Sequence, residues 1–197
     1  MANRVQYGVC NLVFVPLTAD GSDTTAPTYD EKSVIKVPGT VKITVDYESK
    51  ENTFSADNNP KYFNQYGNSG NSGEIELALI PDALNAAAHG WEVDANGGII
   101  EIANGQQKTF AMGYQVEGDE SGKRCWHYNV KLGYPSEEHN TAGEDITPDT
   151  QTLEWSGALV ESKGKQFYRY SLTESTANAA VYKTFLDAVT LPAEVTA

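Results

Sequence analysis

The sequence predicts a mainly β protein, a β-sandwich or open barrel, with one short internal helix and one helix near the C-terminus. Its 17 glycines, 11 tyrosines and frequent threonines favour strands and turns over helices. Several stretches alternate apolar and polar residues, which is the period of a half-buried strand. Hydrophobic residues make up 40% of the 197 residues, enough for the core of one large β domain. We therefore expect residues 1–197 to form a single domain.

The first strands are expected from the N-terminal quarter of the chain. Tyr7–Val15 is a mostly apolar run, and a polar loop follows at residues 18–33. A second strand region begins at Val34, breaks at Pro38-Gly39 and resumes as Val41–Tyr47, where apolar and polar residues alternate.

The segment 48–73 is polar and ends in the Asn-, Gly- and Ser-rich tract 67–73, which is flexible by composition. Two short extended pieces, Thr53–Ala56 and Lys61–Phe63, interrupt it. A stretch of this length within a compact domain often binds a partner. We therefore expect an extended loop that contacts other molecules.

A strand and a helix are expected after this loop. In Glu74–Ile80 the acidic residues share one face, and Ile75, Leu77 and Leu79 share the other. Pro81-Asp82 opens a helix that runs through His89 and is stopped by Gly90.

The second half of the chain contains a strong hairpin signal. Phe110–Glu117 and Arg124–Tyr134 both alternate, and residues 118–123 supply the turn. In the second strand, the alternation places four residues on one face: Trp126, Tyr128, Val130 and Leu132. A polar loop at 135–148 precedes two late strands, at 150–161 and 166–172, and a helix is expected over 177–189. Its apolar side is formed by Val181, Phe185, Leu186 and Val189.

The charge balance argues against a protein that grips nucleic acid. Fourteen Lys and Arg stand against 27 Asp and Glu, a net charge of -13. Between Lys61 and Lys108 there are six acids and no cation, and between Lys131 and Lys163 there are seven acids and no cation. Binding to phosphates requires clustered cations. An acidic surface that repels DNA is compatible with this composition.

No motif in the chain assembles a catalytic or metal site. His89, His127 and His139 lie on different expected elements, and Cys125 with His127 is two ligands short of a closed zinc site. The turns at 20–23 and 94–97 resemble the start of a calcium loop but lack its closing acid. No Gly-x-Ser-x-Gly elbow is present. We expect no enzyme activity and no cofactor.

The chain has two cysteines and no apolar run that reads as a signal peptide or a membrane span. We therefore expect synthesis in a reducing cytoplasm, with no membrane partner.

A series of short motifs, in a fixed order, resembles the major tail proteins of long-tailed, non-contractile bacteriophages, especially those of Gram-positive hosts. The chain departs from the family pattern at 132–135, where a more basic segment is expected. The matching segments span most of the chain and are Tyr7–Leu12, Pro38–Val45, Phe54–Asn58, Gly73–Asp82, Lys108–Ala111, Tyr128–Val130 and Pro148–Leu153.

The resemblance implies a structural protein of the virion tail that assembles in the host cytoplasm. In this family, subunits form hexameric rings, the rings stack into a tube, and one sheet of every subunit lines the lumen through which the genome passes. The implied partners are copies of the same chain, other tail proteins, and genomic DNA that passes without sequence-specific binding. Closing a barrel removes exposed strand edges, which are a hazard of isolated sheets.

Residue assignments follow from combining the resemblance with the strand pattern. Glu74 and Glu76 are expected to face the lumen, with Asp46 and Thr44 next, although alternation identifies a polar face without locating it. The segment 48–73 is expected to contact other subunits. Its candidate contact residues are Phe54, Asp57, Tyr62, Phe63 and Tyr66.

Two other structural roles remain open at this stage. A β-sandwich module that binds carbohydrate or a cell surface would place aromatic residues together on one exposed face. A tube subunit of a phage-derived secretion device would share the fold, and a bound effector would distinguish it.

Overall fold

The computed structural model describes residues 3–141 and 148–193 and is mainly β with two helices. The mainly β class, with one internal and one C-terminal helix, is confirmed. Within the described ranges, the strands are β1 (Gln6–Ala19), β2 (Thr28–Tyr29), β3 (Ile35–Val37), β4 (Thr40–Ile43), β5 (Asp46–Ala56), β6 (Asn59–Leu77), β7 (Glu92–Val93), β8 (Ile99–Ile100), β9 (Phe110–Gly118), β10 (Lys123–Leu132), β11 (Gln151–Gly157), β12 (Val160–Ser162), β13 (Lys165–Phe167) and β14 (Arg169–Thr173); the helices are α1 (Asp82–His89) and α2 (Ala179–Thr184).

Ten strands form one antiparallel sheet, which curls around the larger of two buried clusters as an open barrel. Neighbours follow the order β2-β1-β9-β10-β11-β6-β4, while β3 pairs with β1, β14 with β10 and β5 with β6. Side chains from strands far apart in this order meet in one buried cluster, which is possible only when the sheet is curved. The cluster includes Leu12, Phe14, Val37, Ile75, Leu77, Met112, Val130, Leu153 and Trp155, together with Leu84 and Ala88 from α1.

A second buried cluster lies on the outer face of β9 and β10. Ala111, Trp126 and Tyr128 are buried there beneath Phe185 and other residues from the C-terminal segment. The Trp126 Nε1–H donates to the Phe185 carbonyl at 2.7 Å, and the Tyr128 hydroxyl donates to the carbonyl of Thr190. Both faces of the central hairpin are therefore buried.

The predicted hairpin is confirmed, but the assignment of its second strand to one face was wrong. Trp126 and Tyr128 belong to the outer cluster, whereas Val130 and Leu132 belong to the inner one. The register shifts between His127 and Val130, and Asn129 has a φ of 49°. A bulge of this kind adds one residue to the strand, so the side chains after it point to the other face.

The helix after Pro81 is confirmed, and its end is set by Gly90. Gly90 has a φ of 68°, and its N–H donates to the Ala86 carbonyl, as in a left-handed cap. Leu79, predicted to share an apolar face with Ile75 and Leu77, is exposed because β6 ends at Leu77.

The C-terminal helix is shorter than the predicted 177–189. α2 ends at Thr184, and buried Tyr182 and Phe185 contact the body. Val181, predicted on the apolar side, is 49% exposed. The late strand predicted over 150–161 is also divided, into β11 and β12. In the predicted loop at 135–148, residues 142–147 lie outside the described ranges.

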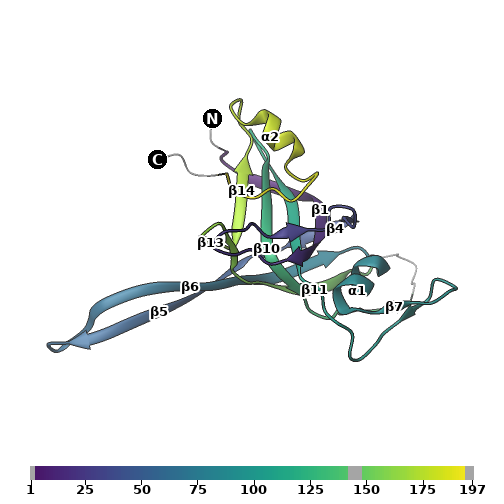
Figure 1. Ribbon diagram of the computed structural model, residues 1–197, viewed down its shortest axis with the longest axis horizontal. Helices are drawn as coiled ribbons and strands as arrows, with labels where there is room; N and C mark the ends of the chain where they lie inside the picture. Colours follow the sequence, from purple (N-terminus) through teal and green to yellow (C-terminus); the bar gives the residue numbers. More distant parts are fainter. Residues whose placement is uncertain (1–2, 142–147, 194–197) are drawn as a thin grey trace.

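The segment 48–73, expected as an extended loop, is a β-hairpin, and the tract 67–73, expected to be flexible, is part of strand β6. β5 and β6 pair from Asp46↔Ser72 to Ala56↔Asn59, and the hairpin projects far from the body (Figure 1). Asp57 and Asn58 both have positive φ, of 49° and 59°, which is the backbone of a tight hairpin turn. We call residues 48–68 of this hairpin the arm.

Candidate assembly surfaces: an acidic sheet face and a projecting arm

The strand register brings the four predicted lumen residues onto one face of the sheet. Asp46 is opposite Ser72, which lies two residues before Glu74, and Glu76 follows two residues later. The Glu74 N–H donates to Thr44 Oγ1 at 2.8 Å. The reverse of these strands carries buried Ile75 and Leu77, so the polar face points away from the core.

Glu154, which the sequence analysis did not single out, lies directly opposite Glu74. Residues paired in this way in an antiparallel sheet have neighbouring side chains, and like charges there repel. In the next pair along, Glu76 is opposite Thr152, and its Oε1 accepts from Thr150 Oγ1 at 2.9 Å. The alternation in β11, where Leu153 and Trp155 are buried, was the signal that identifies Glu154 as outward-facing.

We call this surface the acidic face; it consists of Thr44, Asp46, Glu74, Glu76 and Glu154. It borders Lys42, the partner of Glu76, and Lys131, the partner of Ser156. This surface therefore carries four acidic side chains and is bordered by two lysines. An open hollow of about 810 Å³ is lined by most of this surface: Thr44, Asp46, Ser72, Glu74, Lys131, Glu154 and Ser156.

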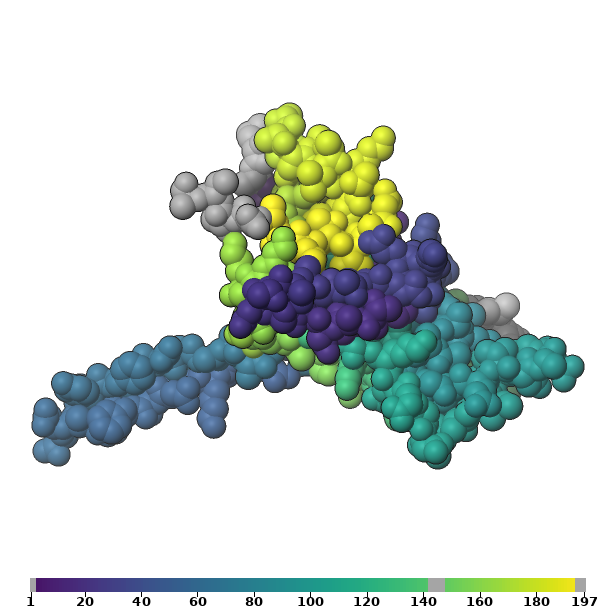
Figure 2. Space-filling model, in the orientation of Figure 1, coloured from purple at the N-terminus to yellow at the C-terminus, as the bar shows by residue number. Residues whose placement is uncertain are grey.

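The arm carries all five predicted contact residues and is exposed on both faces. Phe54 and Phe63 are cross-strand partners and are 62% and 51% exposed. Tyr62 and Tyr66 are also exposed, and Asp57 lies in the turn at the tip. In the space-filling view the arm stands clear of the body along its length (Figure 2). At about 3.3 Å per residue, its strands reach roughly 30 Å.

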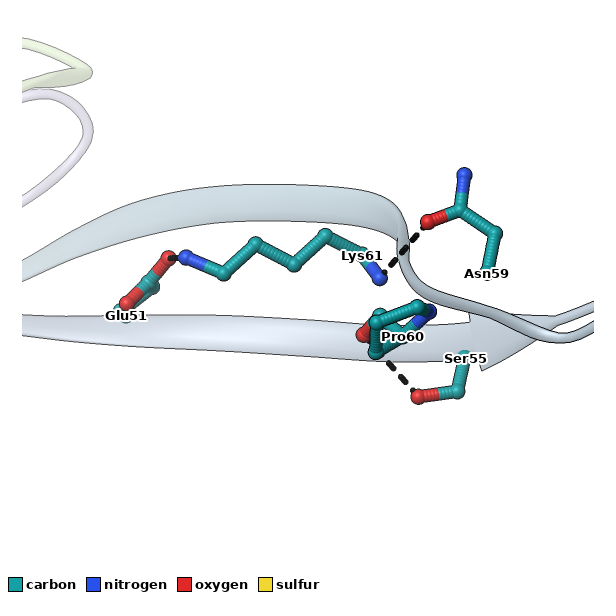
Figure 3. Close-up of polar contacts among 5 residues, drawn as sticks. All are labelled: Glu51, Ser55, Asn59, Pro60 and Lys61. Atoms are coloured by element: carbon teal, nitrogen blue, oxygen red, sulfur yellow. Dashed lines mark hydrogen bonds and ion pairs between the residues drawn. The ribbon is translucent and has the colours of Figure 1, made fainter.

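Polar contacts tie the two strands together near the tip of the arm (Figure 3). Lys61 Nζ lies 2.6 Å from Glu51 Oε1, and this hydrogen bond lowers the pKa of the Glu51 carboxyl. The Lys61 N–H donates to Asn59 Oδ1 at 3.0 Å, and Ser55 Oγ donates to the Pro60 carbonyl at 3.0 Å. These exposed contacts fix the hairpin register but add little stability on their own.

A buried polar network anchors the root of the arm to the barrel. Asn71 of β6 donates from Nδ2 to Nδ1 of His127 at 2.9 Å, and the His127 Nε2 lies 3.3 Å from the Tyr114 hydroxyl. Tyr47 of β5, the register partner of Asn71, accepts from Arg169 Nη1 at 2.7 Å. Both strands of the hairpin are therefore tied to the body at the same level.

His127 is neutral within this network. Burial, and to a smaller extent the nearby Arg169 guanidinium, lower the pKa of its ring to about 3. Arg169 also donates from Nη2 to the Cys125 sulfur at 2.8 Å. Since Cys125 and His127 already bond to protein groups, neither is free to start a zinc site.

The other sequence motifs considered for metal binding serve local structure. Asp94 Oδ1 accepts from the N–H groups of Asn96 and Gly98, at 2.8 and 2.6 Å, as expected for a turn. Among the residues that the structure describes, no group of three His, Cys, Asp or Glu side chains is placed to hold a metal ion. In the same ranges, neither helix has the length and apolar character needed to span a membrane.

Comparisons with known proteins return similar structures but no relative by sequence. No family model matches the chain, and no curated protein matches it. A chain in the cryo-EM structure of the anti-feeding prophage cap, the tube terminating cap, is 10% identical with a TM-score of 0.44, over 88% of this chain and 97% of that one.

Two further structures give similar values. A chain in the six-fold symmetrised anti-feeding prophage baseplate is 8% identical with a TM-score of 0.43, over 87% of this chain and 97% of that one. A chain in the sheath/tube terminator of an extracellular contractile injection system, PVC, is 10% identical with a TM-score of 0.41, over 88% of this chain and all of that one. The function proposed below therefore depends on the geometry of this chain.

Proposed function

We propose that this chain is a structural subunit of a bacteriophage tail tube. Copies assemble into hexameric rings, and the rings stack into a tube whose acidic lumen conducts the genome into the host. The whole chain acts as one tail-tube domain, without catalytic residues or a cofactor. Its place is the virion tail, after assembly in the host cytoplasm, and its partners are further copies of itself and other tail proteins.

The arm is the observation that carries this proposal. A two-stranded hairpin is marginally stable in water by itself, and its outer strand edges leave backbone N–H and C=O groups unpaired. Here such a hairpin also exposes Phe54, Tyr62, Phe63 and Tyr66. These properties favour an element that becomes covered when subunits associate. Phe54, Asp57, Tyr62, Phe63 and Tyr66 are the proposed contact residues.

The acidic face supports the choice of a tube that conducts DNA. A surface of Asp46, Glu74, Glu76 and Glu154 repels phosphates, because it offers no cluster of cations to replace their counterions. A duplex can then slide past it without being held. We propose that Thr44, Asp46, Glu74 and Glu76, together with Glu154, line the lumen.

The test is negative-stain electron microscopy of the purified chain at high concentration and over a range of salt. Wild-type protein is expected to form six-fold rings or hollow tubes, with more assembly at higher salt as repulsion between acidic faces is screened. The variant Phe54→Ser/Phe63→Ser should remain folded but lose these particles, since its aromatic contacts are gone. A Thr53→Ser/Asn64→Ser variant, one residue away on each strand, is the control.

Wild-type particles that lack a central channel, or equal assembly of the aromatic and control variants, would contradict the proposal.

A further inference from the structure

One face of the arm combines exposed aromatic rings with a lysine, and beyond Glu48 at the root of the arm it carries no acid. The register places Lys50, Asn52 and Phe54 on the same face as Phe63 and Gln65 of the facing strand. Lys61 is paired with Glu51, whereas Lys50 has no ion-pair partner among the described residues. We call this surface, Lys50, Asn52, Phe54, Phe63 and Gln65, the lysine face.

The lobe that carries α1 and β7 lies on the opposite side of the molecule from the arm (Figure 1), and apolar side chains gather on it. The Tyr134 ring stacks on His89, with centroids 4.5 Å apart, and the Trp91 ring lies 5.0 Å from His89. Val93 lies two residues after Trp91, in β7, and pairs with Ile99. Val93 and Tyr134 are each 59% exposed. We call Trp91, Val93, Ile99 and Tyr134 the lobe patch.

The lobe that carries this patch is strongly acidic. Residues 82–107 contain Asp82, Glu92, Asp94 and Glu101 and no Lys or Arg. Glu101 follows Ile99 and lies close enough to His89 to oppose the fall in pKa that burial causes in that ring. A negative charge therefore borders the lobe patch, while the positive charge of Lys50 lies four residues from Phe54 on the lysine face of the arm.

We infer that the lysine face of the arm docks on the lobe patch of a second copy of the chain, with Phe54 and Phe63 against Trp91, Val93 and Tyr134 and with Lys50 beside Glu101. This contact rests on the proposed self-assembly and specifies where the arm binds. Both surfaces present exposed apolar side chains, Phe54 and Phe63 on one and Val93 and Tyr134 on the other, and each carries a charge of opposite sign.

The placement of the two surfaces gives the contact a geometric consequence. They lie on opposite sides of one molecule, so each copy offers its arm to one neighbour and its lobe patch to another. A head-to-tail contact of this kind forms a closed ring when the rotation between copies closes, and an open helix when it does not. It therefore builds the kind of assembly that the proposed function requires.

Cross-linking between two singly substituted copies tests the contact directly. In a Cys10→Ser background, with the buried Cys125 left in place, Asn52→Cys is mixed with Ala103→Cys and treated with a short bis-maleimide. Asn52 lies on the lysine face, and Ala103 is exposed two residues after Glu101. We expect a linked dimer in the mixture. The control replaces Asn52→Cys with Thr53→Cys, whose side chain points to the other face, and should give roughly a tenth of that product or less.

Charge exchange provides a second, independent readout. Lys50→Glu and Glu101→Lys should each raise the concentration needed for assembly roughly tenfold, as expected where like charges meet at an interface. The double variant Lys50→Glu/Glu101→Lys should return to the wild-type value. Lys32→Glu/Glu31→Lys, exposed residues in the turn after β2, is the matched control and should change nothing.

The outcomes separate this contact from the function on which it rests. The docking is overturned if rings or tubes form without the specific cross-link, or if the single charge variants assemble like wild type. The proposed function as a tube subunit would still stand in either case. A specific cross-link between copies that never form rings or tubes supports the docking and counts against the tube. If the chain forms no particles and gives no specific cross-link at any concentration, both the docking and the tube are contradicted.

Discussion

The His127 ring lies fully buried between the arm and the barrel, where it bonds Asn71 and faces Tyr114 and Arg169. Sequence reasoning placed His127 beside Cys125 but could not find these partners. Asn71 is 56 residues away along the chain, and only the closing of the sheet brings the two side chains together. Local sequence patterns, which extend over a few residues, therefore could not predict the contacts at the root of the arm.

The depressed pKa of His127 makes the monomer less stable in acid. The ring titrates at about 3 in the folded chain and near 6.5 when unfolded, so between these values the unfolded chain binds the additional proton. Its contribution is complete above pH 6.5 and falls with pH, by up to about 1.4 kcal/mol per pH unit. Urea unfolding of the monomer between pH 7 and pH 5 should show this slope.

His89, whose pKa burial also lowers, contributes in the same direction, so the informative quantity is the change in slope on substitution. His127→Gln should flatten the pH dependence, and His139→Gln, at an exposed position, should leave it unchanged. A His127→Gln slope equal to that of wild type would mean that the ring is not held neutral.

Gly73 shows why a glycine-rich tract was misinterpreted as flexible. A Cβ at this position would lie 2.1 Å from the Thr44 carbonyl oxygen and 2.9 Å from Trp155 Nε1. The glycine is therefore required by close approach of β6 to its neighbours. At Gly67, in the same strand, a Cβ would meet nothing nearer than 3.8 Å.

Gly73→Ala should accordingly destabilise the chain by about 2–3 kcal/mol, because backbone or the Trp155 ring must shift. That corresponds to a fall in Tm of about 5–10 °C for a chain of this size. Gly67→Ala should change the Tm by no more than about 1 °C, since it introduces no contact of this kind. Equal melting of the two variants in a thermal scan would refute the packing argument.

At the scale of elements, the sequence predicted most strands and the internal helix, because alternation and turn residues act locally. The hairpin of β9 and β10 and the helix after Pro81 were both recognised in this way. The bulge at Asn129 was not predicted, because one additional residue does not change the local composition of the strand. It nevertheless moves Val130 to the other face. The arm was missed because its strands lack a buried face and therefore lack alternation.

The arm should behave differently before and after assembly. Over residues 48–67 the only strand pairing of β5 and β6 is with each other, so their amides should exchange hydrogen rapidly in the monomer, like those of other weakly supported elements. The amides of β9 and β10, buried on both faces, should exchange slowly in both states. Hydrogen exchange followed by mass spectrometry checks this, and we expect the arm to become protected in rings or tubes.

Arm amides that are as protected in the monomer as those of β9 would show that the hairpin is stable by itself. Arm amides that stay unprotected in the assembled particle would show that subunits do not cover it.

At the scale of the whole molecule, the sequence pattern grouped the residues of the acidic face, and the register agrees with that grouping; that this face lines a lumen stays a prediction. Thr44, Asp46, Glu74 and Glu76 were selected from alternation and the family resemblance, and the register places them together. Glu154 joins them through the pairing of β11 with β6, which local patterns could not reveal. How these faces are arranged in the assembly depends on the contacts between copies.

A cryo-EM reconstruction of the assembled particle tests the central claim most directly. We expect six copies in each ring around an open channel, with Glu74, Glu76 and Glu154 facing the axis and each arm covered by another copy. A particle whose acidic faces point outward, or whose arms extend freely into solvent, would contradict it.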